Sequence, residues 1–98
     1  MTKREYNFYV YIMASPSGTL YVGFTNNVLR RSIEHKESKN AGFTKEYSCY
    51  KLVYYEYYKY VYDAINREKE IKKWRREKKQ ELIATVNPHW NDLFNDLN

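Results

Sequence analysis

The sequence predicts an α+β fold in which a small, mainly antiparallel sheet of three strands is flanked by helices. Two short runs near the N-terminus and a third at residues 51–58 are rich in β-branched and aromatic residues, which favour strands. Residues 60–86 repeat their apolar side chains at helical spacing. With a further helix between the second and third strands, the expected order is β-β-α-β-α-α. The 98 residues have the length of one domain, which we place at residues 1–98.

The first two strands are predicted to form a hairpin. Residues 7–13 and 19–24 flank the sequence ASPSG, whose proline and glycine favour a turn. Tyr11 and Tyr21 are separated by an even number of residues, so a register centred near Pro16 places both side chains on one face of the sheet. We therefore expect the two tyrosines to be cross-strand neighbours within contact distance.

A helix is predicted to begin directly after this hairpin and to run to about Glu37. The side chains of Thr-Asn-Asn at residues 25–27 can accept hydrogen bonds from the free N–H groups of a helix N-terminus. Arg31 and His35 lie four residues apart and are expected to project together from the flank of the inward stripe. That inward stripe is expected to contain Val28, Leu29, Ser32 and Ile33.

The second half of the chain is predicted to be mostly helical. Residues 37–51 show no clear period and indicate a loop, after which the third strand begins at Lys51. The pattern of residues 60–86 favours two helices with a break near Trp74. It ends before Pro88, because a residue that precedes proline avoids the α region. A final short amphipathic helix is expected to use Trp90, Leu93, Phe94 and Leu97.

Charge and composition limit the classes of function. Lysine and arginine number 17 and acidic residues 12, and the formal net charge of +5 fits a polyanionic partner. We find no signal sequence and no apolar run near the ~18 residues needed to span a bilayer, so we expect a cytoplasmic protein without a membrane partner. Cys49 is the only cysteine and the two histidines lie far apart, which excludes an internal disulfide and argues against a zinc site.

Two segments of the second half have both a structural and a nucleic-acid-binding interpretation. The basic residues of the helical segment form either an ordinary solvated face or a contact surface for phosphates. The candidates for phosphate contact are Lys72, Lys73, Arg75 and Arg76. The tyrosine-rich run at residues 54–62 is expected chiefly to pack within the fold, with base stacking as the alternative.

One acidic residue does not fit the apolar face of the long helical segment. At about 100° per residue, Glu68 falls inside the arc of apolar side chains that would face the core. That arc contains Val61, Ala64, Ile65 and Ile71. Burying an unpaired carboxylate is costly, so Glu68 must be protonated, paired with a cation or bound to a metal. The structural alternative is a partly exposed ion pair with Arg67, Lys72 or Arg75.

These residues together resemble the GIY-YIG nuclease superfamily, in particular its small stand-alone bacterial members. The YVY that ends at Tyr11 is similar to the first motif, and the YVG that starts at Tyr21 is similar to the second. The sequence FTNNVLRRSIEH then places Arg31 and His35 where the family pattern has an arginine and a histidine. The segment DAINREKEIKKWRREKK resembles the helix with the family's metal-binding glutamate, which aligns with Glu68.

The resemblance extends over most of the chain and includes a few departures. The sequence NPHWNDL resembles the ending of the small members, and Asn87 matches the active-site asparagine, which would give polar support. Tyr9 stands where the first motif has glycine, and Val10 and Val22 stand where the motifs have isoleucine. Phe24 occupies a position at which some members carry a lysine.

The resemblance implies an endonuclease that hydrolyses phosphodiester bonds in DNA with one divalent metal ion, Mg²⁺ or Mn²⁺. It assigns the metal to Glu68 and the stabilisation of the scissile phosphate to Arg31. Tyr11 or Tyr21 would accept or position the proton of the attacking water, provided that positive charge lowers the pKa of the phenol. The choice between the tyrosines stays open. His35 would orient a tyrosine, relay the proton or contact phosphate.

Two other functions stay open from the sequence. A basic, tyrosine-rich domain can bind nucleic acid without cutting it, and a basic helix can dock on an acidic protein surface. Metal-dependent cleavage separates the nuclease from the first alternative, and failure to bind nucleic acid at low salt would favour the second. A monomer is favoured, RNA is left open beside DNA, and repair or recombination is the process suggested by family analogy.

Overall fold

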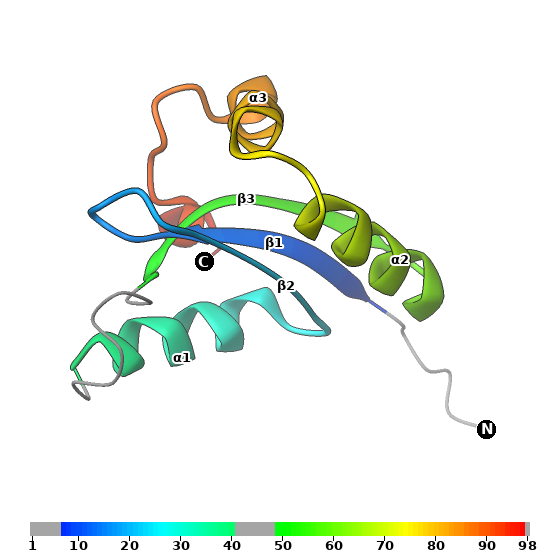
Figure 1. Cartoon of the computed structure of the whole chain (residues 1–98). Coiled ribbons are helices and arrows are strands. Elements are labelled where there is room, and N and C mark those ends of the chain that lie inside the picture. The colour runs from blue at the N-terminus through cyan, green and yellow to red at the C-terminus, as the bar shows by residue number, and fades with distance from the viewer. Residues whose placement is uncertain (1–6, 41–48, 98) are drawn as a thin grey trace.

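The computed structural model describes residues 7–40 and 49–97, and its centre is a three-stranded antiparallel sheet (Figure 1). The strands are β1 (Phe8–Ala14), β2 (Leu20–Thr25) and β3 (Lys51–Tyr58), in the spatial order β2-β1-β3. β1 is therefore the middle strand, and β2 and β3 form the two edges. The α+β class and the expected order of elements are confirmed.

Helices cover both faces of this sheet (Figure 1). α1 (Val28–Asn40) lies on one face, and α2 (Val61–Lys72) and α3 (Arg76–Val86) lie on the other. In β1 and β2, even-numbered side chains such as Ile12 pack in the core with α2 and α3, while Tyr11 packs in a second core with α1. None of the described helices has the length and the apolar run that crossing a bilayer requires.

The hairpin between β1 and β2 places the two tyrosines on one face as expected, but not directly opposite each other. Tyr11 pairs with Gly23 instead, which moves the centre of the hairpin one residue beyond Pro16. Gly18 adopts a φ of 93° in the turn, a conformation that residues with a Cβ rarely adopt. Tyr21 lies diagonal to Tyr11, with their ring centroids 6.1 Å apart.

α1 begins after Thr-Asn-Asn as predicted and is capped there by a side chain. The Oδ1 atom of Asn27 accepts a hydrogen bond of 3.0 Å from the backbone N–H of Arg30, which satisfies one free donor of the first turn. The helix continues to Asn40, beyond the expected end. Residues 37–40 of the expected loop are therefore helical, and residues 41–48 lie outside the described part of the chain.

The predicted inward stripe of α1 is partly wrong. Val28 and Ser32 are buried, but Leu29 and Ile33 are 37% and 41% exposed. The helix is rotated about its axis relative to the prediction, so that the flank with Arg31 and His35 contacts the sheet. This rotation brings polar side chains of α1 to the tyrosines of the hairpin.

The second half follows the prediction as far as α3. β3 occupies residues 51–58, and α2 and α3 are separated by a short break that contains Trp74. The ring of Trp74 packs against two cations, with Arg67 Cζ at 5.1 Å and Lys78 Nζ at 4.3 Å from its centroid. These contacts join the two helices across the break.

The end of the chain differs from the predicted amphipathic helix. It forms only one 3₁₀ turn, η2 (Leu93–Asp96), and Trp90 lies before it with a positive φ of 54°. Trp90 packs against the core of α2 and α3, whereas Leu93 and Leu97 pack against the core of α1. The C-terminal segment (residues 87–97) therefore passes from one face of the sheet to the other around the β3 edge (Figure 1).

Candidate active site

The candidate site is built around Tyr11, in the middle strand of the sheet. Its side chain is only 1% exposed and lies over Gly23 of the edge strand β2. A Cβ atom at position 23 would be 2.6 Å from the Tyr11 hydroxyl oxygen, so only glycine leaves room for the ring. The glycine of the YVG sequence therefore fixes where the Tyr11 hydroxyl can lie.

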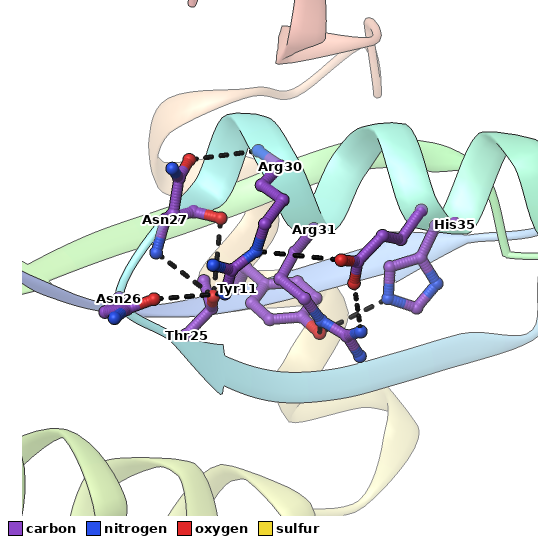
Figure 2. Close-up of polar contacts among 8 residues, drawn as sticks. Tyr11, Thr25, Asn26, Asn27, Arg30, Arg31 and His35 are labelled. Carbon is purple, nitrogen blue, oxygen red and sulfur yellow. Dashed lines mark hydrogen bonds and ion pairs between the residues drawn. The ribbon is translucent and has the colours of Figure 1, made fainter.

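Two side chains of α1 bind this hydroxyl (Figure 2). Arg31 Nε donates to it at 3.4 Å, and His35 Nε2 is 3.2 Å away. Because the oxygen already accepts from Arg31, the consistent arrangement has Tyr11 donating its proton to an unprotonated Nε2 of His35. The predicted pair of Arg31 and His35 is thus brought together on one tyrosine.

The burial of this cluster controls its proton equilibria. Desolvation raises the pKa of Tyr11 to about 12, although the hydrogen bond and the positive charge of Arg31 act in the opposite direction. Arg31 therefore lowers the pKa of Tyr11 as expected, but burial outweighs this effect and the net shift is upward. Burial, followed by the charge of Arg31, lowers the pKa of His35 below its ordinary value of 6.5. At neutral pH the cluster consists of a protonated phenol and a neutral imidazole.

Tyr21 lies at the outer side of the same cluster. Its ring centroid is 5.0 Å from that of His35, and the residue is 38% exposed. Tyr21 is therefore partly accessible to solvent, unlike Tyr11. The structure thus places one buried and one accessible phenol beside the same imidazole.

Arg31 has a second partner that the sequence analysis did not single out. Its Nη1 atom donates to Glu34 at 2.6 Å, and this bond followed by that to Tyr11 raises the pKa of the guanidinium. The same bond lowers the pKa of the exposed Glu34 carboxyl. The i, i+3 spacing of the two residues could have indicated this pair. Among the described residues, no partner occupies Nη2 of Arg31, which is free to bind an anion.

Glu68 lies on α2, and so across the sheet from the Tyr11 cluster. Its side chain is 15% exposed and pairs with Lys72 at 2.8 Å, as the structural alternative predicted. In the described part of the chain it makes no hydrogen bond to Tyr11, Tyr21 or Arg31. We expected Glu68 to lie in one hollow with the two tyrosines and Arg31, but Glu68 makes no direct hydrogen bond to them within the described part of the chain.

The orientation of α2 nevertheless directs Glu68 toward β2, the edge strand next to Tyr11. Ala64 and Ile71 are fully buried and define the inner side of the helix. Arg67 leans toward β3, where it bonds to Glu56 at 2.7 Å. Successive helix residues are rotated by about 100°, so Glu68 lies on the opposite flank, toward β2. The two parts of the candidate site therefore approach the β2 edge from opposite faces.

Asn87 does not belong to this site. Its side-chain amide donates to the carbonyl oxygens of Val53 and Asn91, and its oxygen accepts from the backbone N–H of Asn91. Val53 belongs to β3, at the other edge of the sheet from β2. The structure gives Asn87 the role of holding the C-terminal segment on the β3 edge, which corrects its assignment as an active-site residue.

The four basic candidates are exposed around the break between α2 and α3. Lys73 and Arg75 lie in the break itself and Lys72 closes the end of α2. Arg76 begins α3, and one of its guanidinium nitrogens is 3.0 Å from the position of a Cβ on Gly18 in the hairpin turn. The solvated and phosphate-binding interpretations of these residues both fit this exposure.

A further polar cluster was missed by sequence reasoning. Glu56 accepts hydrogen bonds from the hydroxyls of Tyr54 and Tyr58 and from Arg67. Burial opposes the charge of Glu56, but these donors hold the pKa of its carboxyl below the ordinary value. Their alternation along β3 at positions 54, 56 and 58 could have indicated that the three side chains share a face. Part of the tyrosine-rich run thus packs within the fold, as expected.

Comparison with known proteins assigns the chain to a family. A family model described as the GIY-YIG catalytic domain matches residues 7–81. The chain therefore belongs to the GIY-YIG family, which is part of a superfamily of nucleases. The match includes the hairpin, α1, β3 and α2, and it ends within α3.

Its relatives are small proteins of similar length. A UPF0213 protein of Staphylococcus saprophyticus is 37% identical over 76 residues, which cover 78% of this chain and 93% of the relative. One from Natronomonas pharaonis is 40% identical over 76 residues, covering 78% and 89% of the two chains. The solution NMR structure of a UPF0213 protein from Bacillus halodurans matches with a TM-score of 0.58 at 30% identity, covering 88% of this chain and 92% of that one.

Proposed function

We propose that this protein is a metal-dependent endonuclease that hydrolyses phosphodiester bonds in DNA. The observation that carries the proposal is the cluster in which Tyr11 links Arg31 to His35 at the β2 edge. Such a cluster has the cation that a phosphate needs and a path for the proton of an attacking water. Membership of a nuclease superfamily supports this interpretation.

The residues of the cluster divide the chemistry between them. The free Nη2 atom of Arg31 binds a nonbridging oxygen of the scissile phosphate, because a guanidinium stays charged and is oriented here by Glu34 and Tyr11. The proton of the attacking water passes by way of a phenol, that of Tyr11 or Tyr21, to His35 Nε2. The resulting hydroxide attacks phosphorus, the bond to the leaving oxygen breaks, and the leaving oxygen takes a proton from water. Neutral His35 is therefore the final proton acceptor.

Glu68 is the residue that we propose as the metal ligand. Its carboxylate is nearly buried and already holds a cation, since Lys72 Nζ is 2.8 Å away on a side chain that is itself mostly exposed and free to move. The described residues contain no cluster of three or more candidate ligands. A bound Mg²⁺ or Mn²⁺ would therefore take the Glu68 carboxylate as its protein ligand and complete its shell with waters and phosphate oxygens. Such a metal would stabilise negative charge on the phosphate and the leaving oxygen.

The wider setting of this activity is also a proposal. The exposed basic residues at the α2–α3 break support DNA as the partner, with RNA as the other polyanion to be tested. We place the protein in the cytoplasm as a monomer, acting in repair or recombination, by analogy with the family.

The test is a substrate panel of branched, nicked and single-stranded DNA, with and without Mg²⁺ or Mn²⁺. Metal-dependent cleavage of at least one substrate is expected. Glu68→Gln should reduce the rate by about 10² to 10³, whereas Glu70→Gln, an exposed glutamate on the same helix, is the matched control. Tyr11→Phe and Tyr21→Phe, measured side by side, identify which phenol handles the proton.

The opposite outcomes would contradict the nuclease. If no substrate is cut with either metal, or if Glu68→Gln cuts at the rate of the unchanged protein, catalysis at this site is wrong. Salt-sensitive DNA binding without cleavage would instead support the non-catalytic binding module, for which Glu68→Gln leaves affinity unchanged or higher.

A further inference from the structure

The helix that carries Arg31 and His35 buries few apolar side chains. In the part of α1 whose side chains are described, Val28 is the only buried apolar residue, and Leu29 and Ile33 are exposed. Ser32 is buried too, but its hydroxyl has no hydrogen-bond partner among the residues that the structure describes, so it adds little attachment. Apolar packing alone therefore fixes the position of α1 poorly. Polar contacts must define how far it lies from the sheet.

One of these contacts holds the first turn of α1. Thr25 Oγ1 accepts a hydrogen bond of 3.1 Å from the backbone N–H of Asn27, whose own side chain caps the helix. This contact fixes the helix start relative to β2. It does not hold the later turns of the helix, and His35 lies in the second turn.

A second contact holds α1 next to His35, and it comes from the C-terminal segment. Lys36 Nζ donates to Asp92 Oδ2 at 2.6 Å and to the carbonyl oxygen of Tyr50 at 2.9 Å. The same ammonium group lies 4.7 Å from the centroid of the Phe94 ring. Three partners thus surround the residue that directly follows His35. The helix is therefore tied at its middle as well as at its start.

Asp92 binds the sheet as well as Lys36. Its Oδ1 atom accepts from the backbone N–H of Leu52 in β3 at 3.2 Å and from that of Phe94 at 3.1 Å. Leu52 pairs with Met13 of β1, the strand that carries Tyr11. The Asp92 carboxylate therefore connects α1, through β3, to β1. β1 carries Tyr11, whose hydroxyl contacts His35. A shift of this carboxylate would move α1 relative to β1, and so would change the distance between the Tyr11 hydroxyl and His35 Nε2.

We propose that Asp92 is a positioning residue that acts through Lys36 to hold α1 at the distance from β1 which the Tyr11–His35 hydrogen bond requires. The effect of Asp92 on catalysis rests on the proposed nuclease function. Its effect on the position of α1 does not. Asp92 lies outside residues 7–81, the part of the chain that the family model matches. The C-terminal segment is thus an added support from beyond the part of the chain that the family model matches.

The experiment compares five variants of the full chain, four single variants and the double variant of Asp92→Asn with Lys36→Met. Asp92→Asn weakens the ion pair, and Lys36→Met removes it while leaving the bonds from Asp92 to Leu52 and Phe94 in place. Lys36→Arg keeps the positive charge and should preserve the ion pair with Asp92. Asp96→Asn, an exposed carboxylate of the same 3₁₀ turn, is the matched control. NMR titration reports on the two histidines separately, so the exposed His89 provides an internal reference for His35.

The expected result is a displacement of the site without unfolding. In Asp92→Asn and Lys36→Met, water reaches the His35 ring, so its pKa should rise toward the ordinary 6.5. kcat should fall about tenfold or more with KM nearly unchanged, because small misplacements of catalytic groups are costly. The double variant should be no worse than the single variants, since both remove the same contact. Lys36→Arg and Asp96→Asn should match the unchanged protein.

The proposal is overturned if Asp92→Asn and Lys36→Met lower the thermal midpoint but leave the His35 titration and the ratio of kcat to KM unchanged. That result would make the ion pair purely structural. If the unchanged protein cuts no substrate, the nuclease proposal fails instead, and the His35 titration still decides whether Asp92 positions the helix.

Discussion

The phenol ring of Tyr11 lies so close to the backbone of Gly23 that a methyl group there would be 2.6 Å from the hydroxyl oxygen. The two residues are direct cross-strand partners, and both lie in the part of the chain that the family model matches. The glycine of the YVG sequence is therefore the steric counterpart of the tyrosine that ends YVY. This relationship gives the first prediction.

Gly23→Ala should destabilise the fold by about 1 to 3 kcal/mol, because the added methyl group overpacks the Tyr11 ring. Tyr11→Leu lacks the hydroxyl and ring atoms nearest to position 23, so the same alanine should cost much less in that background. Urea unfolding of the four proteins in this cycle measures the coupling. Equal costs in both backgrounds would show that the Tyr11 ring is not what requires a glycine.

The pH dependence of cleavage should report the ionisation of His35. Neutral imidazole is needed to accept the proton, and burial lowers the pKa of His35 below 6.5. The rate should therefore rise with pH through an ionisation below 6.5 and then stay level to pH 9. Tyr11, with a pKa of about 12, stays protonated over that range. A rate that still rises tenfold per pH unit near pH 9 would indicate a different acceptor.

Nucleic-acid binding should depend on the basic residues of the α2–α3 break. The double variant Lys73→Gln, Arg75→Gln should weaken binding, and each lost phosphate contact should reduce the slope of log affinity against log salt by ~0.9. Fluorescence anisotropy at several salt concentrations measures this slope. Lys59→Gln, an exposed cation between β3 and α2, is the control. An unchanged slope in the double variant would place the binding surface elsewhere.

Glu56 should contribute to stability rather than to catalysis. Glu56→Gln leaves Arg67 and the hydroxyls of Tyr54 and Tyr58 facing an uncharged amide, which should cost about 1 to 3 kcal/mol. Because the folded pKa of Glu56 is lowered from 4.5, this stability is present above pH 4.5 and is lost as the pH falls through the folded pKa. Chemical unfolding at pH 7 and pH 3 tests this, with Glu81→Gln, at an exposed position of α3, as control.

Local patterns were sufficient for most of the fold. The alternation of β-branched and aromatic residues predicts all three strands, and the even spacing of Tyr11 and Tyr21 places them on one face whatever the register. The break near Trp74 was also predicted. The register differs because the positive φ of Gly18 moves the turn.

The rest of the site depends on contacts that have no local pattern. α1 turns Arg31 and His35 inward and leaves Leu29 exposed, since hydrogen bonds to Tyr11 outweigh the burial of one apolar flank. The ion pair of Lys36 and Asp92 joins residues 56 positions apart, a distance at which spacing predicts nothing. Asn87 matched a family motif, but its amide is fully used by backbone groups on the far edge.

The two edges of the sheet differ. The C-terminal segment closes the first half of β3, where Asn87 and Asp92 bind its backbone, whereas no strand of the described chain pairs with the outer side of β2. Any extended peptide that added itself to β2, including a second copy of this chain, would cover the place where the proposed nuclease would bind its sugar-phosphate strand. At high protein concentration, self-association through β2 would then compete with substrate binding, and dilution would remove this inhibition.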